Sequence, residues 1–114
     1  MNGCFFLVNS EILEQVNFMD ENLFLYYEDC VLCKKVRNLG KINIIVNSVK
    51  IKHFRSVSVN KIFKEIDKLV FFYESQFYYH TTYNDVNNFE ILFLGITQSI
   101  SLFFKGVIRF IKKL

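Results

Sequence analysis

The chain has 114 residues, of which 52% are hydrophobic and 18% aromatic, an apolar content too high for an intrinsically disordered protein. Its net charge of +3 is small, and the basic residues gather toward the C-terminus, which argues against a nucleic-acid-binding surface. An odd number of cysteines, three, and an N-terminus without the pattern of a secretory signal indicate a reducing compartment.

The first half of the chain is predicted to alternate strands and short helices. Runs of apolar or alternating residues indicate the strands, and Asn9 or Ser10 is placed to cap the first helix. Gly40 is a natural stop for the second helix, because glycine readily adopts the left-handed conformation that ends helices. The predicted order is strand 4–8, helix 11–16, polar turn 17–23, helix 28–39, strand 42–46 and strand 49–54.

The second half is predicted to be helical, with helix 61–79, a polar loop at 81–88 and helix 89–114. The apolar stretch 91–104 in the last helix contains four polar residues and falls short of the about 18 apolar residues expected of a membrane span. Basic residues then alternate with apolar ones over 105–113, as in a helix that rests on anionic lipid. A helix packed on its own domain or on a partner subunit, with a solvated basic end, fits the pattern equally well.

Two adjacent carboxylates, Glu28 and Asp29, follow an aromatic run and open the helix predicted at 28–39. The first turn of a helix favours negative charge, so these carboxylates stay ionised there. An ionised carboxylate in a substrate site can accept a proton from a hydroxyl group. The alternative is that the pair only stabilises the start of the helix.

The Cys30-x-x-Cys33 spacing invites a zinc or redox interpretation. A structural zinc ion needs two further ligands, and only Cys4, His53 and His80 remain, without a second paired spacing. Both sulfurs fall within the apolar pattern of the predicted helix, so we expect these cysteines to pack in the core.

A longer set of features has a specific order. Gly3 precedes an apolar strand, and the aromatic run 23–27 leads into the carboxylate pair after a Met-Asp-Glu turn at 19–21. Leu32 and Cys33 follow in register, then come Gly40, His53 and Ser58. With these features, segment 3–58 resembles the C-terminal half of the catalytic domain in family 2 glycosyltransferases, particularly the bacterial rhamnosyltransferase-like members.

The resemblance implies an α/β fold: residues 1–58 would be the acceptor-side, C-terminal portion of a glycosyltransferase A-type domain with a mixed sheet, and residues 59–114 a helical tail able to associate with a membrane. It further implies that Asp29 is the general base and that Glu28 orients the acceptor or holds Asp29. Asp20 and Glu21 would shape the acceptor-side loop. His53 would lie near the donor diphosphate and its divalent metal, Mg²⁺ or Mn²⁺, although a lone histidine is as well explained by a structural role.

The implied activity is transfer of a sugar, with inversion, from a nucleotide-sugar donor to a hydroxyl of a glycan or lipid-linked acceptor in bacterial surface polysaccharide synthesis. The implied location is the cytoplasm, at the inner face of the plasma membrane. An N-terminal half supplied in trans is an implied partner.

Several departures from the family pattern bear on these expectations. Val31 stands where the family has a second aspartate, Lys35 replaces the usual arginine, and Ser56 replaces a glycine. No Asp-x-Asp motif and no glycine-rich phosphate loop occurs in the 114 residues. We therefore expect a fragment that is inactive alone. The alternative hypothesis is a non-catalytic remnant or a small membrane-associated interaction module.

Overall fold

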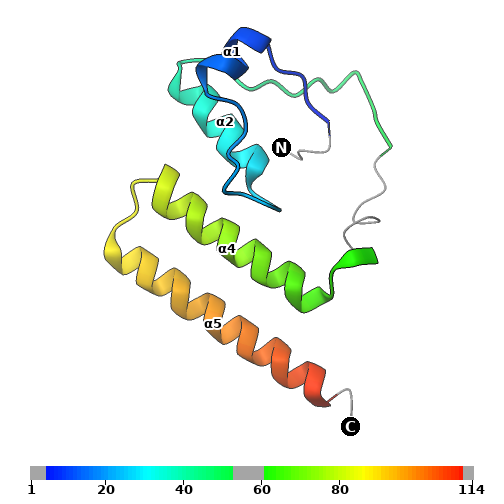
Figure 1. Ribbon diagram of the computed structural model, residues 1–114, viewed down its shortest axis with the longest axis vertical. Helices are drawn as coiled ribbons and strands as arrows, with labels where there is room; N and C mark the ends of the chain where they lie inside the picture. The colour runs from blue at the N-terminus through cyan, green and yellow to red at the C-terminus, as the bar shows by residue number, and fades with distance from the viewer. Residues whose placement is uncertain (1–4, 53–60, 112–114) are drawn as a thin grey trace.

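The chain folds as a set of helices (Figure 1). The computed structural model describes residues 5–52 and 61–111. Its helices are α1 (Ser10–Gln15), α2 (Glu28–Asn38), α4 (Glu65–Tyr83) and α5 (Asn88–Ile111). α4 packs against α2 on one side and against α5 on the other, so α4 forms the middle layer. The domain boundary expected near residue 58 falls at 53–60, outside the described residues.

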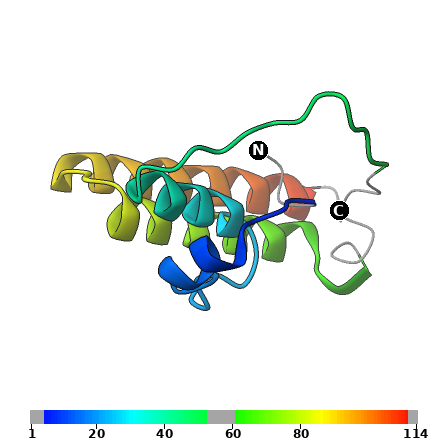
Figure 2. The same cartoon turned by 90° about the horizontal axis from the view of Figure 1, so that it is seen from above.

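The expected α/β fold with a mixed sheet is wrong, because no strand occurs in residues 5–52 and 61–111. Residues 5–8, 42–46 and 49–52 have neither helix nor strand structure. Segment 41–52 runs as an open loop, mostly apart from the helices in both views, and each of its residues is exposed (Figure 2). A strand needs a neighbour to accept and donate its ladder of hydrogen bonds. The alternating sequence supplies the pattern of a strand but not that neighbour.

The helices of the first half begin and end at the predicted local signals. Asn9 caps α1, since its Oδ1 accepts a hydrogen bond from the backbone N–H of Glu11 at 2.8 Å. α2 begins at Glu28 as predicted, and Gly40 follows its C-terminus with a φ of +72°. The N–H of Gly40 donates to the carbonyl of Arg37 at 2.9 Å, which satisfies one of the last carbonyls of the helix.

A small hydrophobic core joins α1 to α2. Val16, Leu32 and Val36 are buried at its centre, and Val31 is fully buried in α2. Partly buried hydrophobic residues pack around that centre, namely Val8, Ile12, Leu13 and Met19. This side of the molecule therefore follows the usual rule that apolar side chains leave water.

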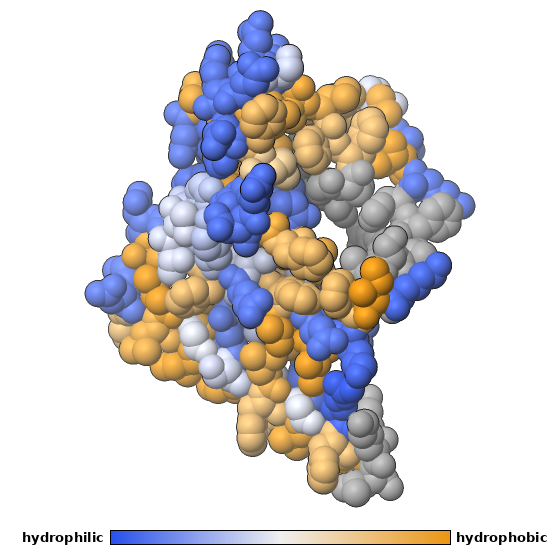
Figure 3. Space-filling view, viewed as in Figure 1, coloured by the Kyte–Doolittle hydropathy of each residue, from blue (hydrophilic) through white to orange (hydrophobic). Residues whose placement is uncertain are grey.

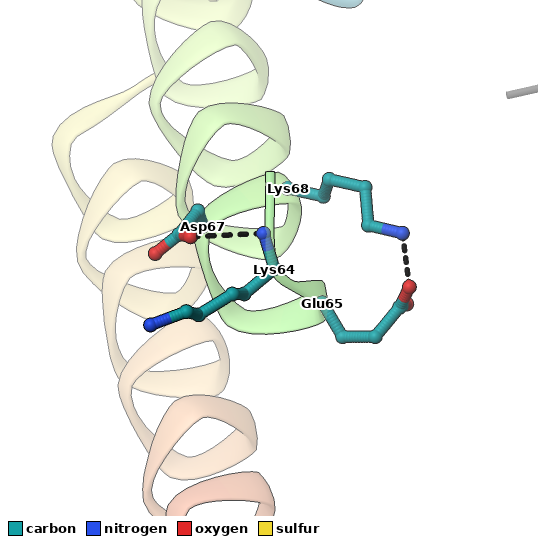
Figure 4. A network of polar contacts seen from close by, with 4 residues as sticks. All are labelled: Lys64, Glu65, Asp67 and Lys68. Atoms are coloured by element: carbon teal, nitrogen blue, oxygen red, sulfur yellow. Dashed lines mark hydrogen bonds and ion pairs between the residues drawn. The ribbon is translucent and has the colours of Figure 1, made fainter. Parts of the chain in front are cut away.

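The N-terminus of α4 is fixed by its own charged residues (Figure 4). Asp67 accepts a hydrogen bond from the backbone N–H of Lys64 at 3.0 Å, and Lys68 forms an ion pair with Glu65 one turn away. The carboxylates lie where the amide groups of the first turn attract negative charge. α4 then continues to Tyr83, so the loop predicted at 81–88 begins only at residue 84.

α5 returns antiparallel to α4 after this short loop. Asn87 and Glu90 cap its start reciprocally: the N–H of Asn87 donates to Glu90 Oε2 at 2.8 Å, and the N–H of Glu90 donates to Asn87 Oδ1 at 2.9 Å. α5 has 24 residues, none of them buried, and is long and apolar enough to cross a membrane by length and composition. The expectation that its apolar stretch is too short for a span is therefore wrong.

Candidate functional site

The carboxylate pair lies at the head of α2, directly after two tyrosines in a strained conformation. Tyr26 and Tyr27 have φ values of 68° and 66°, in the left-handed region that side chains rarely adopt. Such residues cost about 1 to 3 kcal/mol each and persist where their surroundings fix them. Tyr27 occupies the cap position of α2 without a side-chain cap, so Glu28 and Asp29 supply the negative charge there.

Packing against α4 holds this tyrosine turn in place. The ring centroid of Phe72 lies 5.6 Å from those of both Tyr26 and Tyr27, and Tyr27 also lies 5.3 Å from Tyr79. The buried Ser75 donates a hydrogen bond from its Oγ to the carbonyl of Leu25 at 2.7 Å. Burial among these rings raises the pKa of Tyr27, so its hydroxyl stays protonated. α4 thus holds in place the two tyrosines that precede the carboxylate pair.

The two carboxylates differ in their surroundings. Asp29 Oδ1 accepts a hydrogen bond from the backbone N–H of Cys30, the next residue, at 2.9 Å. Glu28 Oε2 is buried and has no hydrogen-bond partner among the described residues. An unpaired buried polar atom costs about 1 to 3 kcal/mol, and in native proteins each one calls for an explanation. A hydroxyl group of a bound molecule would satisfy this oxygen.

Asp20 is engaged elsewhere, in a network that sequence reasoning missed. Its Oδ2 accepts hydrogen bonds from Tyr83 Oη at 2.6 Å and Tyr78 Oη at 2.9 Å, while its Oδ1 accepts from the backbone and side chain of Asn22 at 3.0 and 2.9 Å. Burial favours the neutral acid, but these hydrogen bonds outweigh it and lower the pKa of Asp20 to about 2. Burial and then the Asp20 carboxylate raise the pKa of Tyr83.

The Asp20 network is a structural tie between turn 17–23 and the end of α4. Its two tyrosines lie 58 and 63 residues away in the sequence, and no local pattern marked them as partners. Glu21, on the same turn, is exposed. Both oxygens of Asp20 therefore accept hydrogen bonds from protein groups, whereas the carboxylate oxygen without a partner among the described residues belongs to Glu28. His53 lies outside the described residues.

Two open apolar hollows lie in the described surface, and the carboxylate pair lines neither of them. Both lie along α4 and α5, one lined by Phe77, Ile96 and Ile100 among others, the second by His80, Phe89 and Phe93 among others. In the described part of the chain, no three His, Cys, Asp or Glu side chains gather where they could hold a metal ion.

The cysteines of α2 only partly follow the expectation of core packing. Cys33 is half-buried, but Cys30 is exposed, and neither forms a disulfide bond. Burial, with the nearby Asp29 carboxylate, raises the pKa of both thiols. Raised thiol pKa values oppose formation of the reactive thiolate, so this pair is poorly suited to redox chemistry.

Comparisons with known protein families, with curated proteins and with solved structures find no match to this chain.

Proposed function

We propose that this chain supplies acceptor-side carboxylates to an inverting glycosyltransferase of bacterial surface polysaccharide synthesis, with the donor-binding groups supplied by other polypeptide. The observation that supports the proposal is the buried, unpaired Oε2 of Glu28 beside Asp29 at the head of α2. Acceptors in sugar transfer present hydroxyl groups, which are hydrogen-bond donors for such an oxygen. The tyrosine turn that leads into the pair is strained, as backbone at functional sites often is.

In this proposal the two carboxylates have separate roles. Asp29, in the first turn of α2, accepts the proton of the attacking hydroxyl. Glu28 Oε2 accepts a hydrogen bond from the acceptor and fixes its orientation, which is a large part of the work in a reaction between two bound molecules. The proposal assigns neutralisation of the leaving diphosphate to the donor-binding polypeptide.

The test is transfer of sugar from a nucleotide-sugar donor by the full chain, alone and together with an Asp-x-Asp-bearing polypeptide encoded beside it. We expect no transfer by the chain alone and measurable transfer by the pair. Asp29→Asn should then lower the rate at least a hundredfold, since general base catalysis contributes about 10²- to 10⁴-fold. Glu14→Gln removes an exposed carboxylate from α1 and serves as the control. Unchanged transfer by Asp29→Asn would contradict the base role.

A second candidate function is a small membrane-associated module without chemistry of its own. The observation that favours it is α5, which is apolar over its length yet has no buried residue. Absence of transfer under every pairing, together with lipid binding, would favour this candidate over the enzyme.

A further inference from the structure

The face of α5 toward α4 carries both apolar and polar side chains. Ile91, Leu94, Gly95 and Leu102 are half-buried on that face. Ser101 Oγ accepts a hydrogen bond from Tyr73 Oη at 2.7 Å, and Gln98 Nε2 donates to Gln76 Oε1 at 3.0 Å. This face is therefore already partnered by α4.

The opposite face of α5 is a continuous apolar stripe, which we name the outward stripe. It follows the three- and four-residue spacing of one helix face through Phe89, Phe93, Ile96, Ile100, Phe103 and Val107. These side chains are between 39% and 76% exposed. The space-filling view shows hydrophobic residues gathered along the lower edge of the molecule, over α5 (Figure 3).

The charges of α5 continue the row that faces α4, away from the outward stripe. Lys105 and Arg109 follow Ser101 at four-residue steps, and both are exposed. In the sequence Lys112 and Lys113 come next. Cations on the face opposite an apolar stripe are the pattern of a helix that lies in the plane of an anionic lipid surface, with the stripe in the acyl boundary.

The neighbouring helix decides between lying on a membrane and crossing it. A helix of 24 residues is about 36 Å long, enough for a hydrocarbon core of about 30 Å. α4, however, packs along α5 and carries Glu65, Asp67, Lys68 and Glu74. If α5 crossed the bilayer with α4 beside it, these charges would lie at hydrocarbon depth, where each is costly.

We infer that α5 lies flat in an anionic membrane interface, with the outward stripe in the acyl boundary and with α4 and α2 on the water side. This inference rests on the membrane-associated candidate named above, and it does not depend on sugar transfer. It explains why the most apolar helix of the chain turns its largest side chains away from the protein.

Single tryptophans test this orientation, because the chain has none of its own. Phe89→Trp, Ile100→Trp and Val107→Trp place a reporter near the start, in the middle and toward the end of the outward stripe. Glu74→Trp places one at an exposed position of α4. Each full-length variant is mixed with vesicles of phosphatidylcholine alone, or of equal parts phosphatidylcholine and phosphatidylglycerol, that carry bromine at defined acyl positions.

If α5 lies flat, the three stripe reporters behave alike and the Glu74→Trp reporter behaves differently. The three stripe reporters should shift to shorter emission wavelength and be quenched alike by bromine near the headgroup, whereas the Glu74→Trp reporter should remain in water. Deep quenching of Ile100→Trp alone would mean that α5 crosses the bilayer, and would overturn the flat orientation while keeping membrane association. No binding to either vesicle would overturn both.

A matched pair of charge insertions tests the stripe itself. Ile100→Glu should weaken binding to the anionic vesicles about tenfold or more, since it removes a side chain worth about 1.5 to 3 kcal/mol on burial. Thr82→Glu adds the same charge at an exposed position of α4 and should leave binding nearly unchanged. If Ile100→Glu instead turns a dimer into a monomer in sedimentation and leaves lipid binding unchanged, a second copy covers the stripe and the inference is wrong. Asp29→Asn should bind vesicles as the parent chain does, so that loss of sugar transfer and loss of lipid binding are read separately.

Discussion

The α1–α2 side of the molecule and α5 both contain many apolar residues, but they place them in opposite directions. In the first region Val16, Leu32 and Val36 are buried together. In α5 no residue is buried; Ile91, Leu94 and Leu102 are half-buried toward α4, and the outward stripe is exposed. The same driving force, removal of apolar surface from water, is satisfied within the chain in the first region, whereas the outward stripe needs an external apolar phase.

The sharpest test of this contrast is the same truncation in both regions. Leu32→Ala should lower the free energy of unfolding by about 2 to 3 kcal/mol, because Leu32 is 5% exposed and its loss leaves a cavity. Ile100→Ala should change it by less than about 0.5 kcal/mol, because half of that side chain is already in water. Urea denaturation followed by circular dichroism measures both. Equal losses would mean that α5 contributes to the core, and would remove the contrast.

The second test concerns the hydrogen bonds that join Asp20, in turn 17–23, to Tyr78 and Tyr83 of α4. Asp20 has a pKa of about 2 in the folded chain against an ordinary value of 3.8, so its charge stabilises the fold above the higher value. Stability should fall by up to about 1 kcal/mol as the pH drops from near 4 to near 2, since solvent screening weakens the interactions of a partly exposed carboxylate. Asp20→Asn should lose this part of the pH dependence and be less stable at neutral pH. Thermal melts at a series of pH values measure the effect.

The exposed neighbour of Asp20 provides the control for that test. Glu21→Gln removes a carboxylate from the same turn, and Glu21 is exposed. The Glu21→Gln variant should keep the acid-dependent loss of stability. If it loses that dependence while Asp20→Asn retains it, the tie to Tyr78 and Tyr83 does not stabilise the fold.

The helices were predictable because their signals are local. The Asn9 cap, the carboxylates that open α2 and the glycine at its end all act within a few residues, and the structure uses each of them. The expected sheet failed for the complementary reason. The segment predicted as strand 49–54 has the right alternation, but pairing depends on a second segment that sequence pattern does not supply.

In the candidate site, too, the features that depend on neighbouring residues were predictable and the long-range contacts were not. The placement of Glu28 and Asp29 in the first turn of α2 followed from sequence, because it depends on neighbouring residues alone. The role expected for Asp20 did not allow for its bonds to Tyr78 and Tyr83, which join residues more than fifty positions apart. The exposure of the outward stripe was also not predictable, because periodicity reveals an apolar stripe but not whether it faces protein or solvent.

The smallest expected effect comes from replacing glycine by alanine. This change should lower the stability of the chain at the end of α2 and raise it within α5. Gly40→Ala should destabilise the chain by about 1 kcal/mol, because the φ of +72° at the end of α2 is unfavourable for alanine. Gly106→Ala should stabilise it by up to about 1 kcal/mol, because Gly106 lies within α5 and an added methyl group meets no atom within 4 Å. Paired thermal melts of the two variants measure the signs. Destabilisation by Gly106→Ala would mean that another surface closely approaches α5 at that position.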